Sequence, residues 1–276
     1  MSISINSSSG SLFAQKSLLG TESATQKTLS HLSSGKKINS AQDNAANLAI
    51  AVQMVSQLGS SNQDVNNAGD ALDIANTADA ALDNTTDILS RLDELAMQAG
   101  DGALNASDRG DIQDETDALT AQLDSIAGGT EFNGTPLLSG NANLAFQVGT
   151  GNVAANDRLT LTTGDASAAA LGLSGLKVLT AASASSALDS ISSAMQAASS
   201  LRSTLGAQAN RASSAATQAQ QTSLSLAAAS SGIRDADIAA EASDLSSEMI
   251  QSRAGVAVLA QANQNRQTAL RLLSPG

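Results

Sequence analysis

Residues 112–129, which read IQDETDALTAQLDSIAGG, carry the clearest helical pattern in this sequence. Apolar or small side chains recur there at alternating steps of four and three, at Ile112, Thr116, Leu119, Leu123 and Ile126. Because this spacing places the side chains along one face of a helix, we predict a helix that packs against a neighbouring helix. The pair Gly128-Gly129 lies beyond the last apolar residue and marks the end of the helix.

Two further helices are predicted on the N-terminal side of this segment. The first covers about residues 11–34 and ends at Gly35. Seven-residue spacings relate Leu12 to Leu19 and, separately, Leu18 to Thr25 and Leu32, with Leu29 between. The second begins with a Ser-x-x-Asp capping signal at Ser40 and Asp43 and runs to about residue 99. We expect Gly59 and Gly69 to bend or divide this long helix.

On the C-terminal side, residues 130–180 change character. Asn133-Gly134 is a turn signal, and short alternating stretches at residues 144–148 and 159–161 predict a small β-hairpin region that ends in a Gly- and Ala-rich loop. A long Ala-rich helix is predicted over about 185–231, followed by a break at 232–237. The final helix carries heptad residues at Leu245, Met249, Val256, Leu259, Leu270 and Leu273.

The order of these elements is nearly palindromic, with short helices at both ends and long helices on either side of a β region. The predicted fold is therefore mainly α, a long antiparallel helical coiled-coil bundle built from both chain termini, with a small β-hairpin region in the middle. We divide the chain at 1–40, 41–236 and 237–276. The terminal heptads are partly polar, so the two ends are expected to pair and to become stable only on association. This behaviour is typical of an assembly subunit.

Composition excludes several classes of function. The net charge is −12 at 276 residues, and phosphate binding needs clustered Lys and Arg, so nucleic acid is not an expected partner. No apolar run approaches the roughly 20 residues of a membrane span or forms a secretory signal. There is no Cys, and aromatic residues make up 1% of the chain. Stability must therefore come from the packing of small aliphatic side chains or from assembly.

No catalytic, cofactor-binding or metal-binding pattern is found in the sequence. His31 is the single histidine, and we assign it a surface or inter-subunit packing role. Asp235 and Asp237 are interpreted as part of a turn that caps the last helix rather than as a cation site. Gly128-Gly129 and Gly149-Thr150-Gly151 lack the spacing and the Lys of a phosphate-binding loop. We therefore predict no enzymatic activity and no cofactor.

The residues at the two helix breaks resemble the signatures of bacterial flagellins. Residues 32–43, LSSGKKINSAQD, are similar to the N-terminal signature of that family, and residues 131–134, EFNG, to its turn after the third helix. Residues 146–149, FQVG, resemble the following strand. IRDAD at 233–237 and VLAQANQ at 258–264 resemble the C-terminal signature. The resemblance covers about residues 1–150 and 185–273.

The resemblance implies a structural subunit that polymerises into the flagellar filament for swimming motility. It implies an inner coiled-coil domain made from residues 1–40 and 237–276, and a surrounding helical domain without a large outer insertion. It also implies export of the unfolded chain through the flagellar type III apparatus, an extracellular location in the flagellum, and an export chaperone and cap or junction proteins as partners besides the chain itself.

The resemblance further implies contact with the flagellin-sensing Toll-like receptor of animals. Residues 91–98, RLDELAMQ, resemble the recognised helix, and Arg91, Leu95 and Glu115 fall at the main contact positions. Asp93 stands where many recognised flagellins carry a basic residue. The alternative interpretation of this segment is a solvated helix face with an Arg91–Glu94 pair.

Two alternatives stay open at this point. A hook–filament junction protein shares the N-terminal signature, and the Ala-Gln-Ala-Asn motif at 260–263 and the Phe-Asn-Gly turn favour flagellin over it. A flagellin with an enzymatic or adhesive outer domain is disfavoured, because residues 130–180 are few and contain neither His nor Cys. Residues 264–267, QNRQ, depart from the Gln-Val-Pro that the family usually carries there, and Pro275-Gly276 is appended beyond the last leucines.

Overall fold

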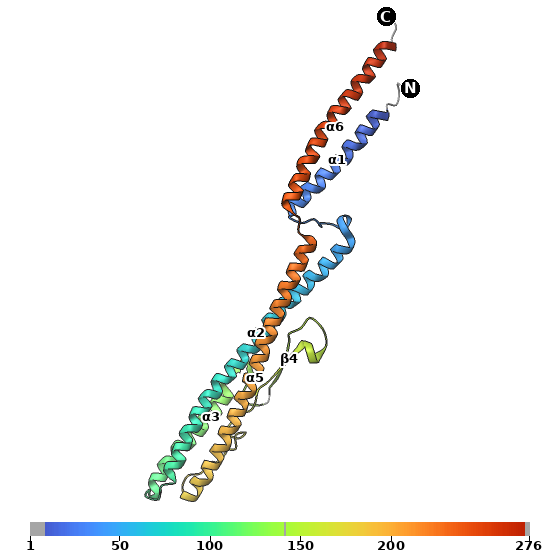
Figure 1. Cartoon of the computed structure of the whole chain (residues 1–276). Coiled ribbons are helices and arrows are strands. Elements are labelled where there is room, and N and C mark those ends of the chain that lie inside the picture. Colours follow the sequence, from blue (N-terminus) through green and yellow to red (C-terminus); the bar gives the residue numbers. More distant parts are fainter. Residues whose placement is uncertain (1–8, 141, 274–276) are drawn as a thin grey trace. The chain divides into compact units, whose positions relative to one another are not determined.

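The computed structural model describes residues 9–140 and 142–273 (Figure 1). The chain is mainly helical, as predicted, with two helices of more than fifty residues and small antiparallel sheets between them. Its residues form two compact units. One comprises the chain up to Ser56 and from Ser225 onward, and the other comprises Gln57–Leu224. We call them the terminal unit and the central unit.

Three helices build the central unit: α2 (Ala41–Ala99), α3 (Ala106–Gly129) and α5 (Ala181–Arg234), of which α2 and α5 belong in part to the terminal unit. The helix predicted from residues 112–126 is confirmed, but it begins earlier. The side chain of Asn105 accepts from the amides of Ser107 and Asp108, and Asp108 caps in return. In α2 the backbone leaves helical geometry at Asn44 and is helical at Gly59 and Gly69, so these glycines do not divide the helix.

The core of the central unit is aliphatic and rich in alanine. Leu82, Leu89 and Leu92 of α2 are completely buried, and so are many alanines on α2 and α5, among them Ala68, Ala71, Ala75, Ala78, Ala194, Ala198 and Ala212. Methyl side chains let two helices approach closely without leaving voids, which explains how the unit folds with almost no aromatic residues. At its margin Arg202 of α5 bridges Asp79 and Asp83 of α2, at 3.0 and 2.7 Å.

The β region contains two separate hairpins rather than one. β1 (Glu131–Phe132) pairs with β2 (Thr135–Pro136) across the predicted turn, where Asn133 and Gly134 have φ of 48° and 75°. These angles define the two-residue turn that matches the twist of a hairpin. β3 (Asn143–Gln147) pairs with β4 (Arg158–Thr162), and a short helix α4 (Ala154–Asp157) lies between them. The inward residues of β4, Leu159 and Leu161, are buried and pack in clusters with residues of both α2 and α5.

The loop between β4 and α5 covers the remaining part of the core. Its Leu173 and Val178 are fully buried. The amide of Gln113 on α3 holds this loop in place, because Nε2 donates to the carbonyl of Leu176 at 2.9 Å and Oε1 accepts from the Val178 amide at 2.7 Å. The hydrogen-bonding groups of the buried Gln113 side chain are thus paired with backbone groups of the loop between β4 and α5.

In the terminal unit, α1 (Ser9–Ser34) packs antiparallel against α6 (Ile238–Leu273). Leu18 lies beside Gly255, and His31 lies beside Glu241 at the other end of the contact. The two helices are joined to their neighbours by short connections at residues 35–40 and 235–237. The pairing of the two chain ends follows the prediction from their matching heptads.

Candidate assembly surface

The contact between α1 and α6 is a regular two-helix seam. Buried or half-buried residues recur at steps of four and three along α1 at Ala14, Leu18, Thr21, Thr25, Thr28 and Leu32. The same rhythm is found along α6 at Glu241, Leu245, Glu248, Ser252, Gly255, Leu259 and Ala262. We call these residues the intrachain seam. It contains few large apolar side chains, so the pair gains little free energy from burial within one chain.

Glycine at position 255 permits close approach of the two helices. A Cβ atom placed there would lie 3.3 Å from Cδ1 of Leu18, which is tighter than an ordinary van der Waals contact. Leu18 therefore packs over the bare backbone of α6. Beside this contact lies a groove of about 340 Å³, lined by Phe13 and Ser17 of α1 and by Gln251 and Val258 of α6.

The large apolar residues that do not belong to the intrachain seam point to solvent. We call them the outer apolar residues, and their exposed fractions range from 49 to 77%: Leu12, Phe13, Leu19 and Leu29 on α1, and Ile238, Met249, Ile250, Val256 and Val258 on α6. Exposed apolar side chains gathered on one helix pair indicate a surface that is covered in an assembly.

The structure divides the predicted assembly residues between the two sets. Leu18, Leu32, Leu245 and Leu259 belong to the intrachain seam, whereas Leu12, Leu19, Leu29, Met249 and Val256 are outer apolar residues. The side chains of Leu270 and Leu273 lie outside the described residues. The two interleaved heptads of the sequence thus have separate positions, one facing the partner helix and the other facing solvent.

A polar network closes the end of the seam that is near the helix breaks. Nδ1 of His31 lies 2.9 Å from Oε1 of Glu241, and Nε2 of the same ring lies 3.7 Å from Oδ1 of Asp43. Nζ of Lys27 lies 3.2 Å from Oδ1 of Asp43. One turn away, the Thr28 hydroxyl donates to Glu248 at 3.1 Å. The network joins α1, α6 and the start of α2.

Asp43 is the fixed anion of this network. Its Oδ2 accepts from the backbone amides of Ser40 and Asn39, at 3.0 and 3.1 Å, as the predicted capping signal requires. These two amides, with the Lys27 ammonium as a further cause, hold the pKa of the Asp43 carboxyl well below its usual range. Asp43 therefore carries its negative charge at any moderate pH.

His31 does not have the role that the sequence suggested. It is 8% exposed and packs inside the chain, between α1 and α6, rather than on the surface. Glu241 and Glu248 were missed altogether as contributors. The heptad positions could have identified them. Thr28 and His31 lie on the face of α1 that carries Leu18 and Leu32. Glu241 and Glu248 lie on the face of α6 that carries Leu245.

The two helix breaks, which carry the family-like motifs, pair with one another. The Lys37 amide donates to the carbonyl of Arg234 at 2.7 Å, and the Ala236 amide donates to the carbonyl of Gly35 at 3.0 Å. Gly35 has a φ of 68°, a backbone conformation that favours glycine. Asp237 accepts from the amides at positions 239 and 240, so its predicted role as a helix cap is confirmed.

The three predicted receptor-contact residues are placed differently from one another. Arg91 and Glu115 are exposed and form an ion pair of 2.8 Å, and Arg91 also pairs with Glu94 at 3.0 Å. The side chain of Leu95 is 1% exposed and packs into the core of the central unit. A buried leucine presents no surface to a partner, so contact with a receptor here would fall to Arg91 and Glu115.

Residues 9–140 and 142–273 contain no group of three or more His, Asp or Glu side chains placed to hold a metal ion. Among the helices of this part of the chain, none has a stretch long and apolar enough to cross a membrane.

Comparison with known proteins supplies the family. Residues 5–143 match the model of the bacterial flagellin N-terminal helical region, and residues 188–273 match that of the C-terminal helical region. The flagellar filament 33 kDa core protein of Treponema phagedenis is 35% identical over 98% of this chain and 99% of its own length. The flagellin of Bacillus subtilis is 36% identical over the same shares.

A solved structure agrees with these matches. The crystal structure of Bacillus cereus flagellin superimposes with a TM-score of 0.51 at 31% identity, and the match covers 56% of this chain and 88% of that one. The helical regions at both ends, the paired breaks and the small β region between them therefore have one explanation: the chain belongs to the bacterial flagellin family.

Proposed function

We propose that this chain is a structural subunit that polymerises into a flagellar filament, and that the outer apolar residues of α1 and α6 form the contacts between subunits. The observation that carries the proposal is the exposure of nine large apolar side chains, among the described residues, on two helices that already pair with each other. Relatives of nearly equal length are named for the flagellar filament core, which supports the same assignment.

The energetics favour coupling between folding of the ends and assembly. Burying one Leu or Val side chain contributes about 1.5–3 kcal/mol. The intrachain seam has few such residues, whereas Leu12, Leu19, Met249 and Val256 have about half or more of their surface available to a neighbour. Burial of these side chains occurs only when neighbouring subunits are bound in the filament. Binding of neighbours therefore stabilises the terminal helices by mass action.

The position of the terminal unit in the filament is part of the proposal. Residues 1–40 and 237–276 form the inner coiled-coil layer, and residues 41–236 form the next shell. The structural division lies further inward, at Ser56 and Ser225, so the terminal unit also includes the first turns of α2 and the last turns of α5.

Export and partners follow from the same function. The chain leaves the cell unfolded through the flagellar type III apparatus, with an export chaperone before secretion and cap or junction proteins at the growing end. The absence of Cys and the presence of two Pro in the sequence suit a chain that is unfolded and refolded. Its location is then the extracellular flagellum. Contact with the flagellin-sensing receptor, through Arg91 and Glu115, is a separate property of the exposed central unit.

The experiment that tests the proposal compares two exposed valines. Val256 is 54% exposed on α6, and Val153 is 57% exposed in the central unit. Purified wild-type, Val256→Asp and Val153→Asp proteins are seeded with filament fragments and examined by electron microscopy and sedimentation. We expect filaments from the wild type and from Val153→Asp, and soluble protein with an unchanged central unit from Val256→Asp. Normal filaments from Val256→Asp would contradict the proposal.

The second candidate function is the hook–filament junction protein. A junction protein would join or cap existing filament ends without extending them. Full-length wild-type protein that elongates seeds into long filaments excludes this candidate, and protein that stops at the seed ends favours it. A chain that lacks residues 1–40 and 237–276 should remain soluble in either case.

A further inference from the structure

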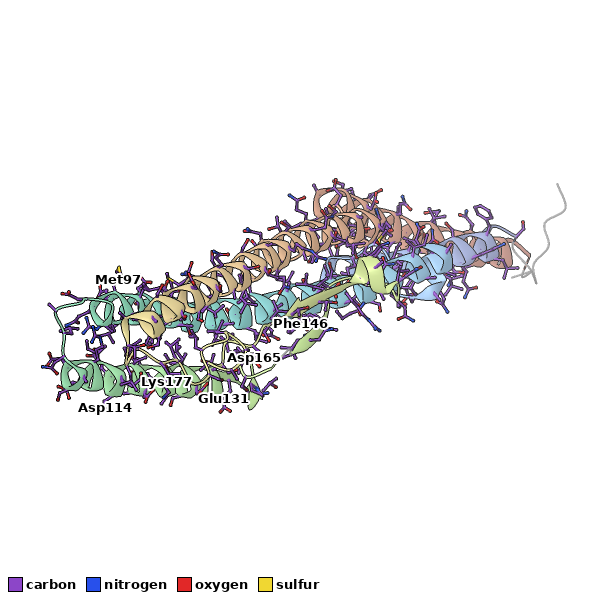
Figure 2. The ribbon with its side chains drawn as sticks, turned by 90° about the horizontal axis from the view of Figure 1, so that it is seen from below. Met97, Asp114, Glu131, Phe146, Asp165 and Lys177 are labelled. Atoms are coloured by element: carbon purple, nitrogen blue, oxygen red, sulfur yellow. The ribbon has the colours of Figure 1, made fainter. Side chains whose placement is uncertain are left out.

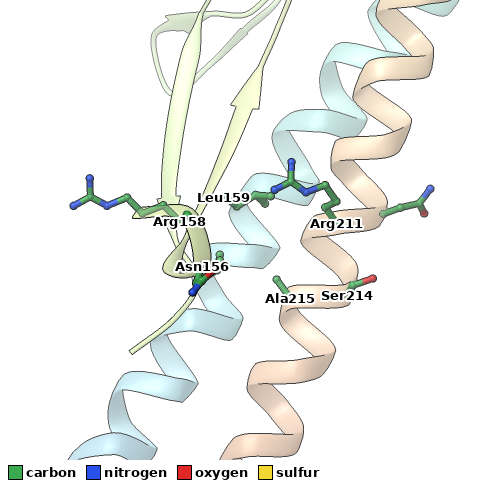
Figure 3. A pocket seen from close by; sticks show the side chains of 9 residues that line it. Asn156, Arg158, Leu159, Arg211, Ser214 and Ala215 are labelled. Carbon is green, nitrogen blue, oxygen red and sulfur yellow. The ribbon is translucent and has the colours of Figure 1, made fainter. Parts of the chain in front are cut away.

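A groove in the central unit lies between the β3–β4 hairpin and helix α5 (Figure 3). It has a volume of about 320 Å³. The hairpin side contributes Asn156 and Arg158, and α5 contributes Asn210, Arg211 and Ser214. Figure 3 shows Arg211 extending from α5 towards the hairpin at Leu159, while Arg158 extends from the far side of the hairpin.

Every polar side chain that lines this groove can donate a hydrogen bond, and none is a carboxylate. Arg158 makes one long bond, 3.4 Å from Nε to Oε1 of Gln147. Among the described residues, the side chains of Asn156, Asn210, Arg211 and Ser214 have no hydrogen bond or ion pair. The groove therefore offers several donors at once to a group that accepts them.

The surrounding charge makes this groove distinct. Residues 57–224 contain nineteen Asp and Glu against six Lys and Arg. Arg91 and Arg202 pair with carboxylates, and Arg109 donates to three backbone carbonyls. Of the remaining three cations, Arg158 and Arg211 line the groove, and Lys177 lies elsewhere. Arg158 and Arg211 thus belong to opposite walls of the groove, Arg158 extends away on the far side of the hairpin, and neither has an anionic partner among the described residues of this strongly acidic unit.

The opposite end of the same unit carries the complementary charge. Asp111 and Asp114 are exposed on α3, and neither has a hydrogen bond or ion pair among the described residues. Ile112, which lies between them, packs in one core cluster with Ala187 of α5. From Ala187 to Arg211 the helix advances roughly 36 Å at about 1.5 Å per residue. Figure 2 shows Asp114 at one end of the central unit and Phe146 of the hairpin well along it.

We propose that the groove lined by Arg158 and Arg211 receives Asp111 and Asp114 of a second copy of this chain. The inference rests on the proposed function, since it assigns a contact within the filament. A donor groove and an acceptor face at opposite ends of one unit cannot satisfy each other within a monomer. They can do so between copies stacked head to tail, and a heterologous contact of this kind generates an open helical filament where the rotation between copies does not close a ring.

Charge reversal and charge exchange test this contact. The variants are Arg158→Glu with Arg211→Glu, Asp111→Lys with Asp114→Lys, and the fourfold variant that carries all of these changes. Exposed ion pairs contribute about 0.2–1 kcal/mol each, so each reversed residue should raise the critical concentration for polymerisation by about 1.4-fold to fivefold. The effect should shrink at 1 M salt, where screening is strong. The fourfold variant restores opposite charges and should recover most of the loss.

Lys177→Glu is the matched control, because it reverses an exposed cation of the same unit that lies outside the groove. Its critical concentration should equal that of the wild type, and thermal unfolding of all variants as monomers should stay unchanged. Loss of polymerisation that the fourfold variant does not recover would overturn the pairing with α3. Groove variants that polymerise like the wild type would overturn the inference while leaving the filament function intact. Wild-type protein that does not polymerise would contradict the proposed function itself.

Discussion

Nδ1 of His31 lies 2.9 Å from Oε1 of Glu241, a residue 210 positions away in the sequence, and both side chains are at most 16% exposed. The other ring nitrogen faces Asp43 at 3.7 Å and has no partner at hydrogen-bond distance. The ring thus connects the two chain ends and the first turn of α2.

Glu241→Ala should weaken the pairing of α1 with α6. Removing one partner from a largely buried hydrogen bond that involves charge costs about 1–3 kcal/mol. In assembled protein we expect filaments that dissociate at a lower temperature, followed by light scattering and by circular dichroism at 222 nm. Asp244→Ala is the control, because it removes a carboxylate from an exposed position of the same helix. Equal effects from both variants would show that His31 does not depend on Glu241.

The terminal unit illustrates what could be predicted from sequence. Heptad spacing identified α1 and α6 and their mutual pairing, because the repeat of apolar residues directly reflects the helical period. It could not decide which of two interleaved heptads faces the partner helix. The sequence pattern does not distinguish Leu12 from Leu18. The structure does, because Leu18 packs over Gly255 of α6. That choice depends on a residue more than two hundred positions away.

The central unit shows the same limit for single side chains. Asn133-Gly134 predicted its turn correctly, since both residues tolerate positive φ, which the turn requires. Leu95 was assigned to a receptor-contact position by resemblance, and its side chain is buried because the leucines of α2 face α5 and the β4–α5 loop. The donor groove was not anticipated either. Its residues come from segments some fifty positions apart, and no local motif brings Arg158 and Arg211 together.

Asp43 should make the terminal unit sensitive to acid. Its folded-state pKa lies below that of an unfolded carboxyl, about 3.9, so the stability it contributes is present above that value. This stability is lost as the pH falls towards the depressed folded pKa. We expect Asp43→Asn to lower the dissociation temperature of filaments at pH 7. The variant should also show a smaller change of dissociation temperature with pH between pH 4 and pH 2. Asp244→Asn serves as control, and an unchanged slope in Asp43→Asn would contradict the assignment.

Leu92→Ala should destabilise the central unit strongly. Leu92 is completely buried among the leucines of α2 and the apolar residues of α3 and α5. Truncation there removes transfer free energy and leaves a cavity that rigid helices cannot fill, for a loss of about 2–5 kcal/mol. Chemical unfolding monitored by circular dichroism measures it. Leu179→Ala, at a position that is 47% exposed, should cost far less. A loss below about 1 kcal/mol for Leu92→Ala would mean that the core relaxes around the missing side chain.

Asp64→Asn should stabilise the central unit at neutral pH. Asp64 is 5% exposed on α2, and burial together with the charge of Asp157 raises the pKa of its carboxyl. The folded chain therefore holds this proton more tightly than the unfolded chain. Stability from the protonated form is fully present below about pH 3.9 and falls as the pH rises through the folded pKa. Above that pH a charged, poorly solvated carboxylate remains inside the unit.

Asparagine has nearly the same shape and no charge, so the variant should melt at a higher temperature than the wild type at pH 7, and the difference should narrow towards pH 4. Thermal unfolding of the full chain, monitored by circular dichroism across this range, measures both effects. Asp70→Asn is the matched control, since Asp70 is exposed on the same helix. A lower melting temperature for Asp64→Asn at pH 7 would show that the carboxylate is held by a favourable charged contact, and that its burial does not oppose folding.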